Sequence, residues 1–218
     1  MKTTTHLLVL FLSFISFQIN AQFTLGVKGG YIKAWQDYGD AALPDDAKIH
    51  VSGYQVSGLF YFEFLKNVSI GIEPGYAQRG AACVPDFIVF NMDKRLLLNY
   101  IELPLMASIN LPVFNNQFEI MGKAGFGASK IVKAYQETKT LGSDEPFERT
   151  EIDLDPTFGT NLNVWDNGFY GGLGLAYKLH DNRLFFEMNY YHGLKDVDTL
   201  NTSKNRSLHY GLGYLIRL

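Results

Sequence analysis

The chain has 218 residues, including 2 Trp, 13 Tyr, 17 Phe and 21 Gly, and 19% of its residues are charged. That charged fraction is below the roughly 25% usual for soluble domains, and the composition excludes a disordered, collagen-like or coiled-coil chain. Lys and Arg number 19 against 22 Asp and Glu, a net charge of -3 without a polybasic run, which excludes a strongly basic nucleic-acid-binding protein.

The first residues have the pattern of a secretory signal peptide. Lys2 precedes an apolar run from Leu7 to Phe17, and Gln18, Asn20 and the small Ala21 follow it. The run is too short to cross a bilayer as a helix. We therefore expect a signal peptide over residues 1–21, cleaved after Ala21, and one exported domain over residues 22–218.

Beyond residue 21, apolar side chains alternate with polar or small ones, and capped helical periods do not occur. This pattern predicts an all-β domain. The eight expected strands cover residues 23–33, 53–65, 67–79, 97–111, 117–131, 168–179, 183–193 and 207–218.

The predicted connections are of two kinds that alternate along the chain. Tight turns are expected at residues 66–67, 112–116 and 180–182, and long loops at residues 34–52, 80–96, 132–167 and 194–206. In an antiparallel meander, this alternation places all long loops at one end and all tight turns at the other. The prediction is an eight-stranded up-and-down transmembrane β-barrel with short periplasmic turns and long extracellular loops.

One face of the predicted strands is apolar along its length, and the other face carries charges. The charged set comprises Glu63, Glu73, Glu102, Glu119 and Glu187 with Lys28, Arg79, Lys123, Lys178 and Arg217. An apolar band of this size exposed to water would promote association, so we expect it to face lipid. An eight-stranded barrel has room inside only for side chains, and unpaired buried charges destabilise a protein. We therefore predict a hydrated, salt-bridged interior and no open pore.

Aromatic residues stand at the loop end of the predicted outward face on seven of the eight strands. They are Tyr31, Tyr54, Tyr76, Phe126, Phe169, Tyr190 and Tyr210. Such residues form girdles at membrane interfaces because they combine an apolar ring with, in Tyr and Trp, a polar group.

The sequence resembles the PorT-like outer-membrane β-barrel family of Gram-negative bacteria. The matching stretches are FTLGVKGGY (23–31), SGYQVSGLFYFEF (52–64), SIGIEPGYAQRG (69–80) and LNYIELPLMASI (98–109), with a weaker likeness in FFEMNYYHGLKDV and LHYGLGYLIRL. The resemblance implies an eight-stranded barrel in the cell outer membrane. It also implies an accessory role of the kind played by the family's namesake in a protein secretion and maturation system.

Candidate catalytic and metal-binding residues are few. His50 with Asp45 and Asp46 is the one loop group that could serve an outer-membrane barrel enzyme, and the other histidines considered, His180, His192 and His209, are scattered. Oxygen ligands for Ca²⁺ could come from Glu145, Glu148, Glu151, Asp153 and Asp155. Their spacing lacks the pattern of a calcium loop, and the alternation from Glu151 to Asp155 favours a strand above the membrane. Cys83 is expected in the second loop without a role, and the sequence predicts no catalytic, cofactor or metal site.

Three functions are compatible with these features. The favoured one is a structural or accessory outer-membrane component that does not act as an enzyme, needs no cofactor and binds no nucleic acid. The second is a binding module that presents loops to a ligand or protein partner, and the third is a barrel enzyme. The four loops sum to a charge of -7, against -4 for residues 22–218, so we expect a partner to bind the acidic loop at 132–167.

Overall fold

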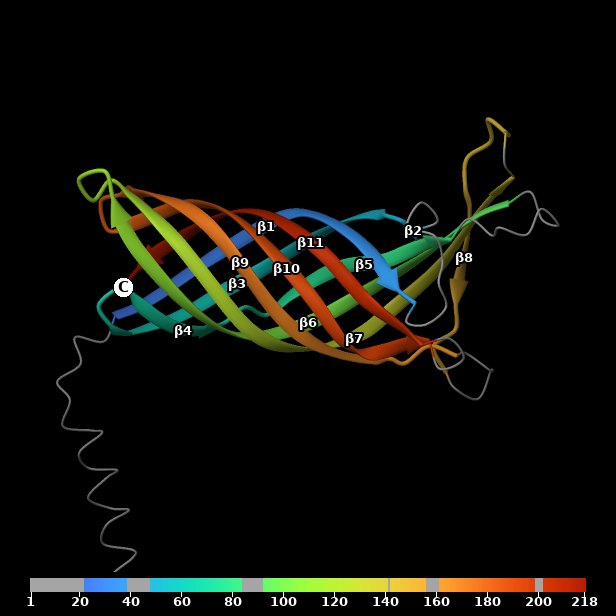
Figure 1. The fold of residues 1–218 in the computed structure, drawn as a ribbon, viewed down its shortest axis with the longest axis horizontal. Helices are drawn as coiled ribbons and strands as arrows, with labels where there is room; N and C mark the ends of the chain where they lie inside the picture. Colours follow the sequence, from blue (N-terminus) through green and yellow to red (C-terminus); the bar gives the residue numbers. More distant parts are fainter. Residues whose placement is uncertain (1–21, 39–47, 84–91, 141, 156–160, 199–201) are drawn as a thin grey trace, which may run out of the picture.

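The computed structural model describes residues 22–38, 48–83, 92–140, 142–155, 161–198 and 202–218. These residues form one elongated antiparallel barrel (Figure 1), which confirms the predicted all-β fold. No helix in this part of the chain is long and apolar enough to cross a membrane. The strands are β1 (Gln22–Asp37), β2 (Lys48–Ile49), β3 (Val51–Leu65), β4 (Val68–Ile72), β5 (Gly75–Cys83), β6 (Met92–Val113), β7 (Phe118–Thr140), β8 (Glu148–Ile152), β9 (Trp165–Leu179), β10 (Asn182–Asp198) and β11 (Ser203–Arg217).

The ring consists of eight barrel strands, because β4 and β5 together act as one. They keep a single register against β3 on one side and β6 on the other. The interruption between them falls at Pro74, which has no N–H to donate to the ladder. The Gly58 N–H still donates to the Pro74 carbonyl at 2.9 Å, and the Glu73 N–H donates to the Pro104 carbonyl at 3.0 Å. The ring then closes through pairing of β1 with β11.

The register around the ring defines a stagger of ten residues. A row of paired residues that starts at Leu25 in β1 returns to the same strand at Trp35. The row passes through Phe60, Ile72, Leu105, Phe126, Phe169, His192 and Arg206. Closing a barrel with such a stagger requires strands tilted by about 35–45° from its axis. Figure 1 shows the strands slanted relative to the long axis of the barrel.

All three tight turns lie at one end of the barrel, as predicted. Asn67, Asn116 and His180 adopt left-handed backbone conformations with φ of 66°, 66° and 60°. Asn enters this region more readily than most residues, which explains its use here. The third turn is one residue shorter than expected, because Asn182 already begins β10. The C-terminus lies at the same end, since the Leu218 N–H donates to the Phe23 carbonyl at 2.9 Å.

The strands extend further toward the loop end than predicted. β6 starts at Met92 and β7 ends at Thr140, beyond the expected limits of 97 and 131. β10 and β11 also continue into the expected loop at 194–206. In β7, Ile131 pairs with Tyr100 and Lys133 with Asn99, so Val132 forms a β-bulge. A bulge shifts the in-and-out alternation by one residue, which hides the continuing strand from pattern analysis.

Two other expectations for the loops change in detail. Cys83 is the last residue of β5, where it pairs with Lys48, and so does not lie in a loop. The strand expected at residues 151–155 exists as β8, but it covers Glu148–Ile152 and pairs with β7.

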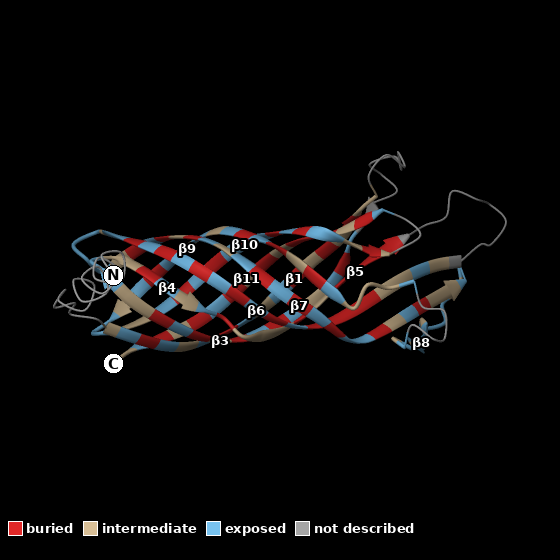
Figure 2. Cartoon of the chain, turned by 90° about the horizontal axis from the view of Figure 1, so that it is seen from below, coloured by how far each residue is buried: buried red, intermediate tan, exposed pale blue. Residues whose placement is uncertain are grey.

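Burial alternates along the barrel strands, as the banded colours in Figure 2 show. Large apolar side chains are exposed on the outer wall, including Phe23, Val56, Phe60, Ile101, Leu103, Leu105, Leu173, Phe186 and Leu212. Six of the predicted girdle residues contact one another between neighbouring strands. Tyr54 stacks on Tyr76 with ring centroids 5.5 Å apart, Phe126 meets Phe169 at 5.5 Å, and Tyr31 meets Tyr210 at 6.3 Å.

Candidate functional site

A cluster of four charges crosses the middle of the lumen. Lys28 and Lys123 each donate to both Glu73 and Glu187, with N–O distances of 2.5 to 2.7 Å. The Tyr61 hydroxyl also donates to Glu73, and the Asn189 amide donates to Glu187 at 2.7 Å. All four charged side chains are buried. Two ammonium groups shared between two carboxylates compensate the charges locally, which a low-dielectric interior requires.

A second layer lies nearer the loop end and centres on Arg79. Its guanidinium donates to Glu102 and, at 2.9 Å, to the Tyr170 hydroxyl. The guanidinium carbon lies 4.1 Å from the centre of the Tyr191 ring and 5.2 Å from that of Tyr100. Arg79 is therefore held both by a carboxylate and by aromatic faces, a combination suited to a buried guanidinium.

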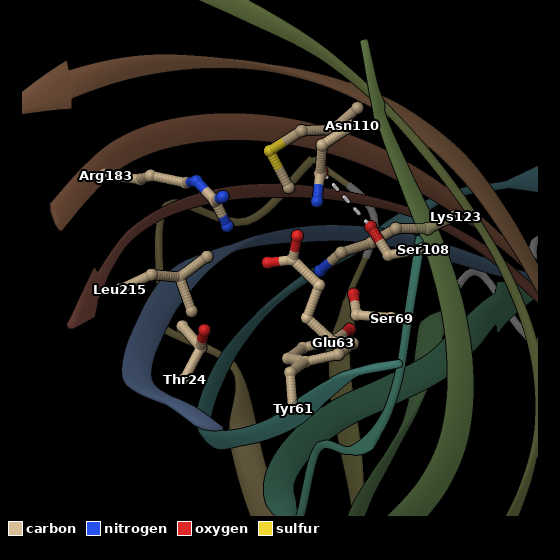
Figure 3. Close-up of a pocket in the computed structure, with 10 residues that line it drawn as sticks. Thr24, Tyr61, Glu63, Ser69, Ser108, Asn110, Lys123, Arg183 and Leu215 are labelled. Atoms are coloured by element: carbon tan, nitrogen blue, oxygen red, sulfur yellow. Dashed lines mark hydrogen bonds between the residues drawn. The ribbon is translucent and has the colours of Figure 1, made fainter. Parts of the chain in front are cut away.

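The turn end of the lumen contains the remaining charge pairs and a very small cavity. Glu119 lies 2.8 Å from both Lys178 and Arg183, and Glu63 lies 3.5 Å from Arg217. Figure 3 shows polar side chains converging on the cavity, with Ser108 donating to Asn110 at 3.3 Å. The cavity measures about 10 Å³, which is room for about one water molecule. Polar and charged side chains therefore line the lumen at this end, with a cavity the size of about one water molecule between them.

Apolar side chains pack together at the loop end of the lumen, and we call this cluster the apolar seal. It consists of Leu98, Tyr100, Ile131, Ala134 and Val197, with Leu154, Leu162 and Val164 packed against them. Backbone hydrogen bonds fix the covering segment: the Ile131 N–H donates to the Val164 carbonyl, and the Asn163 N–H to that of Val197, both at 2.8 Å. Beyond the girdle the interior therefore combines these apolar side chains with buried polar ones, such as Asn205, which donates to Asp166 at 2.8 Å.

The structure pairs all ten charged residues that the sequence placed inside the barrel. Sequence analysis missed Arg183, which shares Glu119 with Lys178, because it lies next to a predicted turn. The tyrosines that complete both layers were given no role from the sequence. Their inward positions on the alternating pattern were the available signal, but aromatic residues are equally suited to the outer wall.

The structure brings together one arrangement that resembles a nucleophile with a base. Ser207 Oγ lies 2.8 Å from His209 Nε2, and His209 Nδ1 lies 2.8 Å from the Gln55 amide oxygen. All three side chains are buried in the barrel, with exposed fractions of 4% or less. A substrate could not reach Ser207, so this group acts as a structural hydrogen-bond chain.

His50, the histidine considered for a loop site, lies beside an aromatic ring. His50 packs edge-on against Trp35 at 5.2 Å, and Asp45 and Asp46 lie outside the described residues. Partial burial lowers the pKa of His50 from its usual value, and the positive charge of Lys33 lowers it further. Within the described segments, no group of three or more His, Cys, Asp or Glu side chains is arranged to hold a metal ion.

Three strands extend beyond the girdle as an outer platform, formed by β8 with the loop-side ends of β6 and β7. Arg149 of β8 donates to Glu137 of β7 at 2.5 and 2.9 Å. Residues 142–155 expose six acids with Arg149 as their one base. The acids are Asp144, Glu145, Glu148, Glu151, Asp153 and Asp155.

A closed antiparallel barrel with an apolar outer wall and paired charges inside is the architecture of an integral outer-membrane protein. The chain belongs to the outer membrane protein β-barrel domain family, whose sequence model matches residues 16–199. The cell outer membrane is therefore its location. No curated protein sequence matches the chain.

Solved structures of outer-membrane proteins resemble this chain at low sequence identity. Neisserial surface protein A is 13% identical with a TM-score of 0.47, covering 91% of this chain and 99% of that one. The attachment invasion locus protein Ail of Yersinia pestis is 14% identical with a TM-score of 0.39, covering 88% and 98%. A major outer membrane protein from Thermus thermophilus is 10% identical with a TM-score of 0.49, covering 91% and 99%.

Proposed function

We propose that this protein is a non-conducting structural or accessory component of the outer membrane. The observation that carries the proposal is the filled lumen. An ion entering from the loop end would first meet the apolar seal, then Arg79 with its aromatic neighbours, and then the four-charge cluster. Each layer is held by contacts between strands that are not adjacent in the ring, so opening one would break several interactions at once.

The specific accessory role in this proposal is support of protein secretion or assembly, of the PorT-like type. Its support is the likeness of residues 23–31, 52–64, 69–80 and 98–109 to that family. The proposal includes no catalysis by this chain. It is consistent with the burial of Ser207 and His209 and with the packing of His50 against Trp35.

Planar-bilayer recordings test the non-conducting barrel. The purified, folded protein is added to one chamber, and a general porin is added to a parallel membrane as the positive control. We expect no discrete conductance steps from this protein in concentrated potassium chloride, while the porin gives steady channels. Steady channels of porin size from the folded barrel would refute the proposal.

A second candidate function is a surface binding module, and the outer platform favours it. Six exposed acids lie within residues 142–155 on a segment held to the barrel by β8 pairing with β7. A rigid, acidic surface attracts cationic partners, with a reach of about 8 to 10 Å at physiological salt. In this candidate the barrel is an anchor and the platform is the part that binds a protein partner.

A further inference from the structure

The two tryptophans of the chain lie in corresponding positions on the outer wall. Trp35 on β1 stands four residues beyond the girdle residue Tyr31, on the loop side, and Trp165 on β9 stands four residues beyond Phe169. Each has a lysine nearby on the same level: Lys33 two residues from Trp35, and Lys130 paired in register with Trp165. We call Lys33, Trp35, Lys130 and Trp165 the basic collar.

The collar lies at the depth of lipid headgroups. Four residues of a strand tilted by about 40° rise about 10 Å along the barrel axis. The headgroup region on each side of a bilayer is about 5 to 8 Å thick and begins where the aromatic girdle ends. Lys33, two residues or about 5 Å above the girdle, therefore lies within this layer. Trp35, Lys130 and Trp165 lie at its outer edge, within reach of the lipid phosphates.

At the level of the basic collar, the charged residues at the outward positions of the barrel strands are basic. The first two outward positions beyond the girdle on each described barrel strand include no Asp or Glu. Arg206 also lies at this level, but it is paired with Asp37 at 3.5 Å, on the next outward position of β1. Within the described part of the chain, Lys33 and Lys130 form no salt bridge. The acidic residues of the platform lie further out, so the collar is a separate band of opposite charge.

The local geometry suits an anionic group beside an aromatic ring. Lys130 Nζ lies 5.5 Å from the centre of the Trp165 ring, and Trp165 is 54% exposed. Trp35 contacts Tyr190 at 6.2 Å and His50 at 5.2 Å. The lowered pKa of His50 has Lys33 among its causes, which is consistent with positive potential at this level. The Lys130 site thus joins a cation to a partly exposed indole, and at the other site Lys33 stands two residues from Trp35 on the same strand.

We propose that the basic collar binds the phosphate groups of lipids in the outer leaflet of the membrane, through one site at Lys33 and Trp35 and one at Lys130 and Trp165. The lysine ammonium groups contact phosphate oxygens while their alkyl stems follow the apolar wall. The indoles pack against the lipid and can donate their N–H at headgroup level. A lipid is the occupant because the sites continue directly into the apolar wall below, where Ile101 and Phe169 are exposed.

Tryptophan fluorescence gives a direct test, since Trp35 and Trp165 are the chain's two tryptophans. The folded protein in dodecyl maltoside micelles is titrated with diphosphoryl lipid A, with its dephosphorylated form, and with inorganic phosphate. We expect the emission to change with diphosphoryl lipid A at much lower concentration than with the other two. The variant K33Q/K130Q should bind diphosphoryl lipid A about 25-fold more weakly, or about fivefold for each lysine removed.

The matched control is K66Q/K94Q, which removes the same charge elsewhere. Lys66 is in the turn between β3 and β4, and Lys94 is well beyond the collar on β6. The affinity of K66Q/K94Q for diphosphoryl lipid A should equal that of the unchanged protein. Equal binding of phosphorylated and dephosphorylated lipid, or equal weakening by both variants, would overturn the proposal. An equal response to inorganic phosphate would overturn the assignment to a lipid. Gel migration before and after boiling verifies that every variant is folded.

Discussion

Lys123 of β7 and Glu187 of β10 lie 2.7 Å apart across the lumen, although their strands do not pair in the ring. Lys28 of β1 joins the same carboxylate at 2.6 Å. The contact shows how paired charges stabilise the lumen beside a buried apolar cluster that includes Leu59, Met121 and Phe185. Charges on distant strands hold opposite walls together, and each charge has two partners.

Replacement of Glu187 by Gln should destabilise the barrel strongly. The substitution leaves Lys28 and Lys123 sharing one carboxylate, and a buried charge that loses its partner typically costs about 3 to 5 kcal/mol. Urea unfolding of the protein in lipid vesicles, followed by tryptophan fluorescence, measures the change. E151Q on the exposed strand β8 is the control and should change the free energy of unfolding by less than about 0.5 kcal/mol. A loss below about 1 kcal/mol for E187Q would show that the cluster contributes little.

At position 67, replacement of Asn by Gly should preserve the stability of the barrel, and replacement by Val should lower it. Its φ of 66° lies in the left-handed region, where a β-branched residue is strained. We expect N67V to lower the free energy of unfolding by about 1 to 2 kcal/mol, and N67G to leave it nearly unchanged. The same urea experiment compares the two variants. Equal stability of N67G and N67V would mean that the turn between β3 and β4 can form with another backbone conformation.

The folded barrel should resist cold detergent. The ring of paired strands leaves no open edge within the membrane-spanning part described, so separating one strand requires breaking two ladders. On a gel in dodecyl sulfate, the unheated protein should migrate differently from the boiled protein. Identical migration, together with recovery in the soluble fraction, would contradict a membrane-embedded barrel.

The acidic platform should determine how strongly the protein retains a partner that co-purifies from native membranes in mild detergent. A variant with D144N, E145Q, E148Q and E151Q keeps the shape of the platform but removes four negative charges. We expect it to retain less of the partner, and the unchanged protein to lose the partner as salt rises. Deletion of residues 140–157 is the stronger test, although Ile152 and Leu154 also pack against the apolar seal. Undiminished binding in both variants, in folded protein, would place the partner's site elsewhere.

Local sequence patterns were sufficient to predict the strands and the side-chain orientations in the membrane-spanning half of this protein. Alternation in residues 53–65 and 97–111 determined which side chains face lipid, because a strand's side chains point alternately to opposite faces. Asn in the turns marked where strands reverse. The ten inward charges were also evident, since a charge on a lipid-facing position is strongly disfavoured.

Tertiary structure decided the rest, because those features depend on which strands meet across the lumen. Which acid pairs with which base follows from the ten-residue stagger, and nothing local specifies that Lys123 reaches Glu187. The bulge at Val132 reverses the alternation in β7, so the extension of the barrel and the apolar seal could not be read from the pattern. Trp35 and Trp165 are 130 positions apart in sequence, and only closure of the tilted ring places both at the same depth of the membrane.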